Sequence, residues 1–353
     1  MASAAQRRIK SISYAKYGYI FILPFFLVYF FFQLWPLINT FILAFETNIV
    51  PKGESAKFVG LENFKDLLFG GSSLPVKAAH ETFFKSLGNT FILWIGNFIP
   101  QIALSLSLAV WFTDAKLKIP GKGFFKVIMY LPNIITAASV AVLFLQLCGQ
   151  SENAPGALNS LLSKIGIVET KANGMIVPIE FIKGCWQSRG VVMFIQTWMW
   201  FGNTMIMLMS GIMGINPSLF EAASIDGASS GQVFRKITVP LLSPILAYTV
   251  ITSMIGGLQM FDIPYLYNKD RNVNDNLRTV AVFIFEKFHP QGSAKIQYGY
   301  SGAASVILFF ITLALGLIAL YLTRDKDEAA KKKQRRQAAK LAKQKSQFGG
   351  MSI

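Results

Sequence analysis

The first long apolar stretch of the chain, residues 17–45, reads YGYIFILPFFLVYFFFQLWPLINTFILAF and carries no charged side chain. A helix needs roughly 20 apolar residues to cross about 30 Å of hydrocarbon. Lipid offers the backbone no hydrogen-bond partner, so a spanning segment of this kind should be helical and not extended. The stretch therefore predicts a membrane-spanning helix, and its length exceeds the apolar core of a secretion signal.

Five further uncharged runs of comparable length follow, and with the first they predict six transmembrane helices. The composition supports an all-α integral membrane protein, because 53% of the 353 residues are hydrophobic and only 15% are charged. Soluble domains carry about 25% charged residues. The further runs cover residues 86–113, 127–151, 190–220, 237–261 and 296–323.

The charges of the connecting segments predict the orientation of these spans. If both termini lie on one side, residues 1–16, 114–126, 221–236 and 324–353 share that side with a net charge of +14, against +2 for the other side. Basic segments stay in the cytoplasm. We therefore expect a cytoplasmic N-terminus over residues 1–16, a six-helix membrane domain over 17–323 and a basic cytoplasmic tail over 324–353. The tail suits anionic lipid headgroups or nucleic acid, and we favour the lipid and expect no nucleic-acid partner.

The chain lacks the sequence signatures of an ATPase or of a metal centre. No GxxxxGK[ST] phosphate loop occurs, so we expect no ATPase site in this chain. The predicted spans hold no charged side chain and no His, which weakens the case for a proton or sodium carrier. Two cysteines, Cys148 and Cys185, and two histidines are too few for a metal centre built from these residue types. We predict no metal site and no catalytic residues, and leave a Cys148–Cys185 disulfide open.

The segment between the fourth and fifth runs, residues 216–240, reads NPSLFEAASIDGASSGQVFRKITVP. Asn216 is a favourable helix cap and Pro217 suits the first helical position. Gly227 can take the left-handed conformation that ends a helix. A second short amphipathic segment follows through Phe234 and Ile237. The pattern predicts two short helices around a glycine on the cytoplasmic side, with a plain connector as the simpler alternative.

The run from Glu221 to Ala228, followed by Phe234, Ile237, Pro240 and Leu241, resembles the EAA loop of binding-protein-dependent ABC importer permeases of the carbohydrate and glycerol-phosphate subgroup. The resemblance covers roughly residues 17–323, except that Asn268-Lys269-Asp270-Arg271-Asn272 stands where the family usually has a glycine-rich stretch. The further matches are Gly88-Asn89-Thr90 with Gln101, Gly123-Phe124-Phe125 with Leu131-Pro132, Gly156 with Leu158-Asn159, and Tyr298-Gly299-Tyr300 with Ala303-Ala304-Ser305.

This resemblance implies a type I ABC importer permease in a bacterial-type inner membrane. The implied partners are a second permease, related rather than identical, two P-loop ATPase subunits and an external solute-binding protein. ATP and Mg²⁺ would be bound by the ATPase subunits, and this chain would bind no cofactor. The coupling loop, about residues 216–239, would dock into the ATPase, with Glu221 meeting a basic side chain and Gly227 setting the angle between the helices. The implied coupling residues are Glu221, Ala222, Ala223, Asp226, Gly227 and Phe234.

Two sets of residues in the spans that flank this loop are candidate substrate contacts. Within each set the spacing is i, i+4 and i+7, which places the residues on one helix face. Polar groups in hydrocarbon are costly unless they face a partner or a wet cavity. Amides beside an aromatic ring suit a sugar, and helix packing is the alternative of equal weight. The sets are Gln196, Trp200 and Asn203 in the fourth run, and Ser253, Gly257 and Met260 in the fifth.

These observations predict the permease subunit of an ATP-driven importer that moves a sugar, an oligosaccharide or a polyol phosphate inward by alternating access. The alternative is an ATP-independent secondary transporter or channel. A membrane scaffold or signalling subunit is a third class, and it gives no reason for the EAA-like loop.

Overall fold

The computed structural model describes most of the membrane domain. The N-terminal segment before residue 15, the basic tail and residues 269–274 lie outside the described residues, so the predictions made for them stay predictions. The described ranges are 15–50, 55–114, 117–149, 155–169, 171, 175–268, 275–290, 292 and 295–322.

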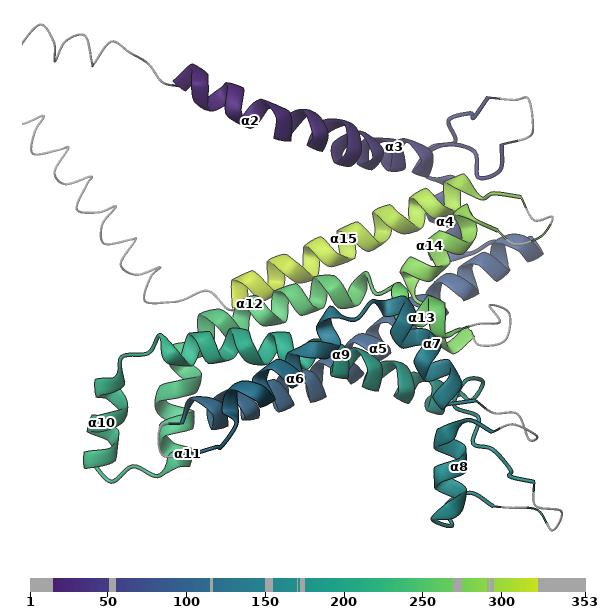
Figure 1. Cartoon of the computed structure of the whole chain (residues 1–353). Helices are drawn as coiled ribbons and strands as arrows, with labels where there is room; N and C mark the ends of the chain where they lie inside the picture. Colours follow the sequence, from purple (N-terminus) through teal and green to yellow (C-terminus); the bar gives the residue numbers. More distant parts are fainter. Residues whose placement is uncertain are drawn as a thin grey trace, which may run out of the picture. The chain divides into compact units, whose positions relative to one another are not determined.

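Within these ranges the backbone is almost entirely helical, and its β-structure is one isolated bridge between Glu46 and Phe58 (Figure 1). This confirms the predicted all-α class. The elements in chain order are α2 (Ala15–Tyr29), the π-helical turn η1 (Phe30–Leu34), α3 (Trp35–Ala44), α4 (Glu62–Phe69), α5 (Leu74–Thr113), α6 (Lys122–Ile134), α7 (Ala137–Leu147), α8 (Ala157–Lys164), α9 (Cys185–Met213), α10 (Pro217–Ile225), α11 (Ser230–Val233), the π-helical turn η2 (Phe234–Thr238), α12 (Val239–Leu258), α13 (Asp262–Tyr267), the 3₁₀ turn η3 (Asp275–Leu277), α14 (Val280–Phe288) and α15 (Tyr298–Leu322).

Among the described residues, five helical segments are long and apolar enough to cross a membrane, and a bent pair of helices makes a sixth span if it counts as one. Each of the six overlaps a predicted span. If the bent pair counts as one span, the predicted number of six is confirmed. The five single segments are Tyr17–Ala44, Leu74–Thr113, Cys185–Met213, Ser230–Tyr267 and Tyr298–Leu322.

The third predicted span, residues 127–151, differs from the expected continuous helix. It consists of α6 and α7, which meet at an angle of 94°. Ile135 and Thr136 between them are extended, and the Thr136 hydroxyl accepts a hydrogen bond from the Ser139 amide at 3.4 Å. Pro132 near the end of α6 cannot donate to the helix, and Thr136 caps the next one, so the helix stops and restarts.

Two spans pass through a π-helical turn directly before a proline. In the first span the Trp35 amide donates to the Phe30 carbonyl, and Pro36 follows. In the fifth the Val239 amide donates to the Phe234 carbonyl, and Pro240 follows. A proline ring clashes with the carbonyl four residues before it, and a wider turn relieves that clash. The fifth helical segment is therefore continuous from Ser230, which lies seven residues before the predicted start of that run at residue 237.

The chain divides into two compact units. The first comprises Met1–Phe83 with Phe283–Ile307, and the second Phe84–Val282 with Leu308–Ile353. In the first unit the Asn63 amide donates to the carbonyls of Ala44 and Glu46 at 3.0 and 2.7 Å, and the Tyr300 hydroxyl donates to Asp66 at 2.8 Å. These bonds fasten α4 between the end of α3 and the start of α15.

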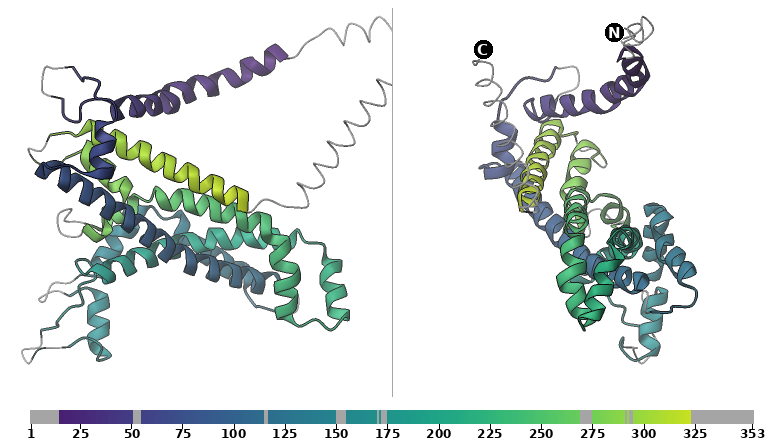
Figure 2. Two further views of the ribbon diagram at one scale, coloured as in Figure 1. Left: turned by 180° about the vertical axis from the view of Figure 1, so that it is seen from behind. Right: turned by 90° about the vertical axis from the view of Figure 1, so that its left-hand side faces the viewer.

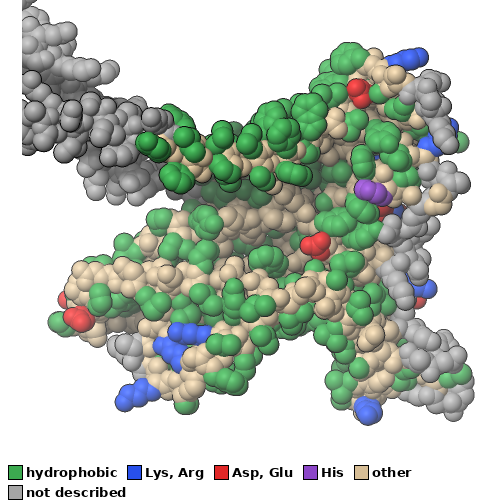
Figure 3. Space-filling view, turned by 45° about the horizontal axis from the view of Figure 1, so that its top comes forward, with side chains coloured by type: hydrophobic (Ala, Val, Ile, Leu, Met, Phe, Trp, Pro, Cys, Tyr) green, Lys and Arg blue, Asp and Glu red, His purple; other side chains and the backbone are tan. Residues whose placement is uncertain are grey.

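The second unit is built around α9, whose spanning part is half buried. One apolar cluster joins α9 to α7 and α13, and another joins it to α5 and α12. The crosswise helices α10 and α11 lie at one end of this unit, and α8 lies at the other (Figures 1 and 2). Figure 3 shows Lys and Arg side chains at both ends of the molecule, with Asp and Glu side chains among them. Which end faces the cytoplasm remains the sequence-based prediction.

Candidate functional site

The α10 helix begins and ends as its sequence predicts. The Asn216 side chain accepts a hydrogen bond from the Ser218 amide at 3.1 Å, and Pro217 is the first helical residue. Gly227 has φ +72°, the left-handed conformation in which glycine is favoured. The Ala228 amide donates to the Ala223 carbonyl at 2.9 Å, and the Gly227 amide to the Ser224 carbonyl at 3.3 Å. This pair of bonds is a Schellman motif, which fixes the turn after α10.

The start of α11 is fixed by a reciprocal cap that the sequence analysis missed. The Ser229 amide donates to the Gln232 side chain at 2.8 Å, and the Gln232 amide donates to the Ser229 hydroxyl at 3.4 Å. The signal was present as a Ser followed three residues later by Gln. Only Ala228 stands between Gly227 and this cap, so the two helices are joined by a turn that is hydrogen-bonded on both sides.

The predicted coupling residues form an exposed surface on this pair of helices. Glu221, Ala222, Asp226 and Gly227 are exposed, whereas Ala223 is buried and Phe234 is half buried. Ile225, which the sequence analysis did not select, is 86% exposed at the end of α10. Burying an exposed apolar side chain against a partner lowers the free energy of the complex. The surface therefore combines a carboxylate with an apolar tip on a rigid turn.

The first set of candidate substrate contacts lies on one face of α9, as its spacing predicts, but the three side chains differ in exposure. Gln196 is 8% exposed, whereas Trp200 is 47% exposed and Asn203 is also exposed. On its other sides α9 is held by polar contacts with α5, where Gln101 donates to the Thr204 hydroxyl and Ser105 to the Phe201 carbonyl, each at 2.8 Å. Trp200 and Asn203 thus face outward from a fixed helix.

The second substrate set contacts another tryptophan. The Trp94 Nε1 donates to the Ser253 hydroxyl at 3.3 Å, and a Cβ added to Gly257 would lie 2.0 Å from the Trp94 ring. Met260 is buried in the cluster with α7 and α9. The small residues make room for an indole from α5, which fits the packing alternative. Trp94 was missed because no local pattern relates it to residues 159 or more positions away.

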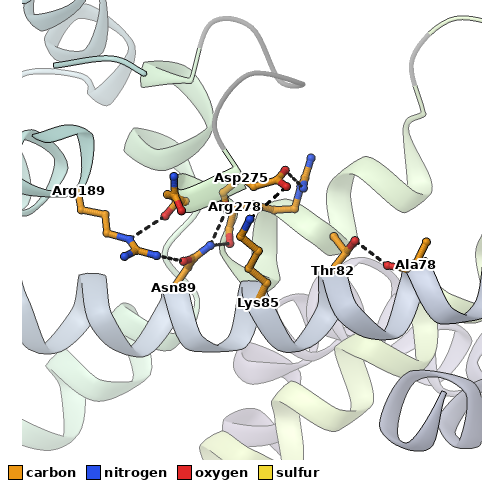
Figure 4. A network of polar contacts seen from close by, with 8 residues as sticks. Ala78, Thr82, Lys85, Asn89, Arg189, Asp275 and Arg278 are labelled. Carbon is orange, nitrogen blue, oxygen red and sulfur yellow. Dashed lines mark hydrogen bonds and ion pairs between the residues drawn. The ribbon is translucent and has the colours of Figure 1, made fainter. Parts of the chain in front are cut away.

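A polar network at the end of the second unit opposite α10 was also missed by sequence reasoning (Figure 4). Arg189 is 8% exposed and donates through Nη2 to the Asn89 Oδ1 at 2.6 Å. The Asn89 amide donates to the carbonyls of Asp275 and Arg278 at 2.7 and 3.0 Å. The network joins α5 and α9 to the segment that begins with η3. Asn89 belongs to a motif that supported the family resemblance, but its partners are 100 and 186 residues away.

Asp275 carries the ion pairs of this network. Its carboxylate contacts Arg278 and lies 3.3 Å from the Lys85 Nζ. Burial alone would raise the pKa of Asp275, but the charges of Arg278 and Lys85 outweigh it and hold that pKa below its ordinary value. A lowered pKa stabilises the fold fully above the unfolded pKa of about 3.9, and this contribution is lost as the pH falls through the folded pKa. The ion pairs are therefore complete at neutral pH.

Replacing Arg189 by Met should destabilise this end of the second unit. The change keeps an apolar stem but leaves the buried Asn89 Oδ1 without its charged donor, a loss of about 1–3 kcal/mol. We expect a lower thermal midpoint and faster hydrogen exchange in residues 275–282. Lys85→Met is the control, because that pair is about half exposed and worth ~1 kcal/mol or less. Equal effects of the two changes would contradict the assignment.

The two cysteines, left open by the sequence, are both free thiols. Cys148 is buried and Cys185 is partly buried. No disulfide therefore joins the segment after α7 to the start of α9 in this structure.

This chain is similar in sequence to known transport permeases over most of its length. The arabinooligosaccharides transport system permease protein AraP of Bacillus subtilis is 27% identical over 324 residues, which cover 91% of this chain and 94% of that protein. The lactose transport system permease protein LacF of Rhizobium radiobacter is 26% identical over 331 residues, which cover 92% and 100%.

Solved structures show the same fold. A chain of a bacterial ABC transporter that imports the acidic polysaccharide alginate matches with a TM-score of 0.71 at 22% identity, covering 90% of this chain and 98% of that one. This confirms the predicted ABC importer permease fold. The family described as binding-protein-dependent transport system inner membrane component matches residues 90–325. That match spans about two thirds of the sequence, and the chain belongs to this family of transport permeases.

Proposed function

We propose that this chain is the permease subunit of an ATP-driven importer that moves a sugar, an oligosaccharide or a polyol phosphate from an external binding protein into the cytoplasm by alternating access. The observation that carries the proposal is the rigid and exposed α10–α11 turn at one end of the spanning helices. A turn hydrogen-bonded on both sides of Gly227 can transmit a push from a partner, whereas a mobile loop would absorb it.

The other functions of the transporter belong to partner subunits. Two P-loop ATPase subunits bind ATP and Mg²⁺, and this chain contributes no ATPase site and no cofactor. A second permease completes the pore. Glu221 meets a basic side chain of the ATPase, beside the apolar tip at Ile225. We further propose that the α10–α11 end and both termini lie in the cytoplasm of a bacterial-type cell, as the charges of the connecting segments predict.

The substrate class rests on composition and on the relatives. Two of those relatives are named for the transport of arabinooligosaccharides and lactose. In this chain Trp200 and Asn203 offer an indole face beside an amide on an exposed helix face. A sugar presents an apolar C–H face and a polar rim. The indole can contact the C–H face while the amide forms hydrogen bonds with the rim. We infer that the Trp200 face lines the substrate path and that Gln196 adjoins it.

Replacing Trp200 by Ala should lower uptake roughly tenfold, as expected for loss of an aromatic contact worth ~1.4 kcal/mol. Assembly should be unchanged, because the side chain is about half exposed and its removal leaves no buried cavity. Uptake of labelled sugar into proteoliposomes measures the effect. Trp111→Ala is the matched control, since Trp111 is 57% exposed on α5. Uptake equal to wild type for Trp200→Ala would remove it from the substrate path.

The experiment that tests the class is purification of the chain from its native membrane in a mild detergent, with mass spectrometry of the accompanying proteins. A P-loop ATPase and a second six-helix permease in near-equal amounts support the proposal. A chain that purifies alone and transports sugar in liposomes without ATP would instead support a secondary transporter or channel.

A further inference from the structure

An apolar groove opens on the side of the second unit, between α7, α8 and the first turns of α9. Its volume is about 660 Å³, within the roughly 300–1,000 Å³ typical of small-ligand sites. Among the lining residues Gln187 is the only amide, and none is charged or carries a hydroxyl group. A hydrated ligand would lose its hydrogen bonds there, so the groove suits a hydrocarbon and excludes a sugar. Representative lining residues are Phe144, Cys148, Leu158, Leu161, Trp186 and Phe194.

The groove has a closed floor and an open side. Cys148 is 2% exposed and belongs to the apolar core cluster, against which Phe144 packs. Leu161 and Phe194 are each 58% exposed, and Trp186 is 67% exposed. A hydrocarbon that enters from the side would therefore contact core side chains at one face and these three side chains at its rim.

The position of α8 indicates that the groove lies at the membrane–water interface. This helix lies at the end of the second unit opposite α10 and runs across the direction of α9 (Figures 1 and 2). Leu161 is exposed on α8, and Ile165 and Ile167 follow it with exposures of 61% and 63%. Exposed apolar side chains on a crosswise helix are typical of a segment that lies in the membrane interface. The Arg189 guanidinium lies over the Trp186 ring, 5.0 Å from its centroid. Tryptophan is enriched at the membrane–water interface, so Trp186 also fits that position.

The open side of the groove continues into the apolar flank of the spanning helices. Val142 and Leu143 on α7 are 55% and 47% exposed, and Phe194 lies two turns into α9. In a membrane such a flank is in contact with acyl chains. The groove is thus a recess in an exposed apolar surface, and an acyl chain that reaches this surface could fill it without another protein.

We propose that this groove binds one acyl chain of a phospholipid from the leaflet on the side opposite the α10–α11 turn. The chain lies between α8 and the α7–α9 pair and holds α8 against them. The site is separate from the proposed substrate face, and it does not depend on which solute is transported.

The test is photolabelling of the whole complex in nanodiscs of phosphatidylethanolamine and phosphatidylglycerol that contain a diazirine-bearing acyl chain. We expect adducts concentrated on peptides that contain residues 144–148, 157–161 and 186–194. Gly190 lines the groove, and an added Cβ there meets no atom within 4 Å. Gly190→Phe should therefore fill the groove and lower this labelling about tenfold, as expected for the loss of roughly two buried methylenes of contact.

Two matched variants keep the test decisive. Gly316→Phe on α15 also adds a ring at a helical glycine with open space around it, and labelling of the groove should be unchanged. Leu161→Gln adds a polar group at an exposed rim position without bulk, and labelling should fall even if Gly190→Phe fails to fold. The proposal would be overturned if all spanning helices were labelled to the same extent and if Gly190→Phe and Leu161→Gln left the labelling unchanged. A photocrosslinker at Phe194 that joins the second permease instead of lipid would also overturn it.

Discussion

Replacing Gly227 by Leu is expected to abolish substrate-stimulated ATP hydrolysis and uptake. Gly227 has φ +72°, where an L side chain costs about 1–2 kcal/mol. That cost lowers the population of the native turn roughly 5–30-fold. No atom lies within 4 Å of an added Cβ, so the leucine would project into the exposed surface between α10 and α11. Backbone strain and added bulk therefore act on the same docking surface.

Two milder variants separate these effects. Gly227→Ala keeps the strain and adds only a methyl group, so an intermediate loss measures the contribution of the backbone. Gly227→Asn tolerates the left-handed conformation and should retain most of the activity. The assay is ATP hydrolysis by the assembled transporter in nanodiscs, with and without the loaded binding protein. Normal stimulation of the Gly227→Leu complex would show that this turn does not couple the subunits.

The features that the sequence predicted correctly are those encoded locally. Uncharged runs located the six spans, because a charge inside hydrocarbon is costly at any position in the fold. Their limits were less exact, since α5 begins 12 residues before the second run and α9 ends seven residues before the end of the fourth. The Asn216 cap and the Gly227 turn each depend on residues within five positions of one another. The capping box of Ser229 and Gln232 is equally local, because the two residues lie three positions apart, so the sequence also contained this signal.

The features that could not be predicted depend on residues far apart in the chain. The bend after Pro132 required knowing that Thr136 would restart the helix, since a proline alone often only kinks a spanning helix. The Arg189–Asn89 bond joins residues 100 positions apart. Spacing put Ser253 and Gly257 on one face correctly, but only the fold shows that Trp94 occupies that face. Periodicity identifies a helix face and leaves open what covers it.

Close contact between α6 and α9 leads to a second strong prediction. A Cβ added to Gly202 would lie 2.0 Å from the Met129 carbonyl oxygen and 2.9 Å from the Tyr130 Cα. These are backbone atoms of α6, so no side-chain rotation can relieve the clash. Small residues permit such close approach of helices in membranes. The two helices must separate if Gly202 gains even a methyl group.

Overpacking by Gly202→Ala should cost roughly 1–3 kcal/mol, and the clash with backbone atoms favours the upper end of that range. The gain in helix propensity from Gly to Ala, ~1 kcal/mol, then leaves a net destabilisation of up to about 2 kcal/mol. Gly190→Ala is the matched control on the same helix, because nothing lies within 4 Å of its added Cβ and only the propensity gain remains. Thermal unfolding of the purified complexes should move in opposite directions for the two variants. If Gly202→Ala were as stable as Gly190→Ala, α6 and α9 would not pack through this glycine, and the contacts that orient the Trp200 face would have to be sought elsewhere.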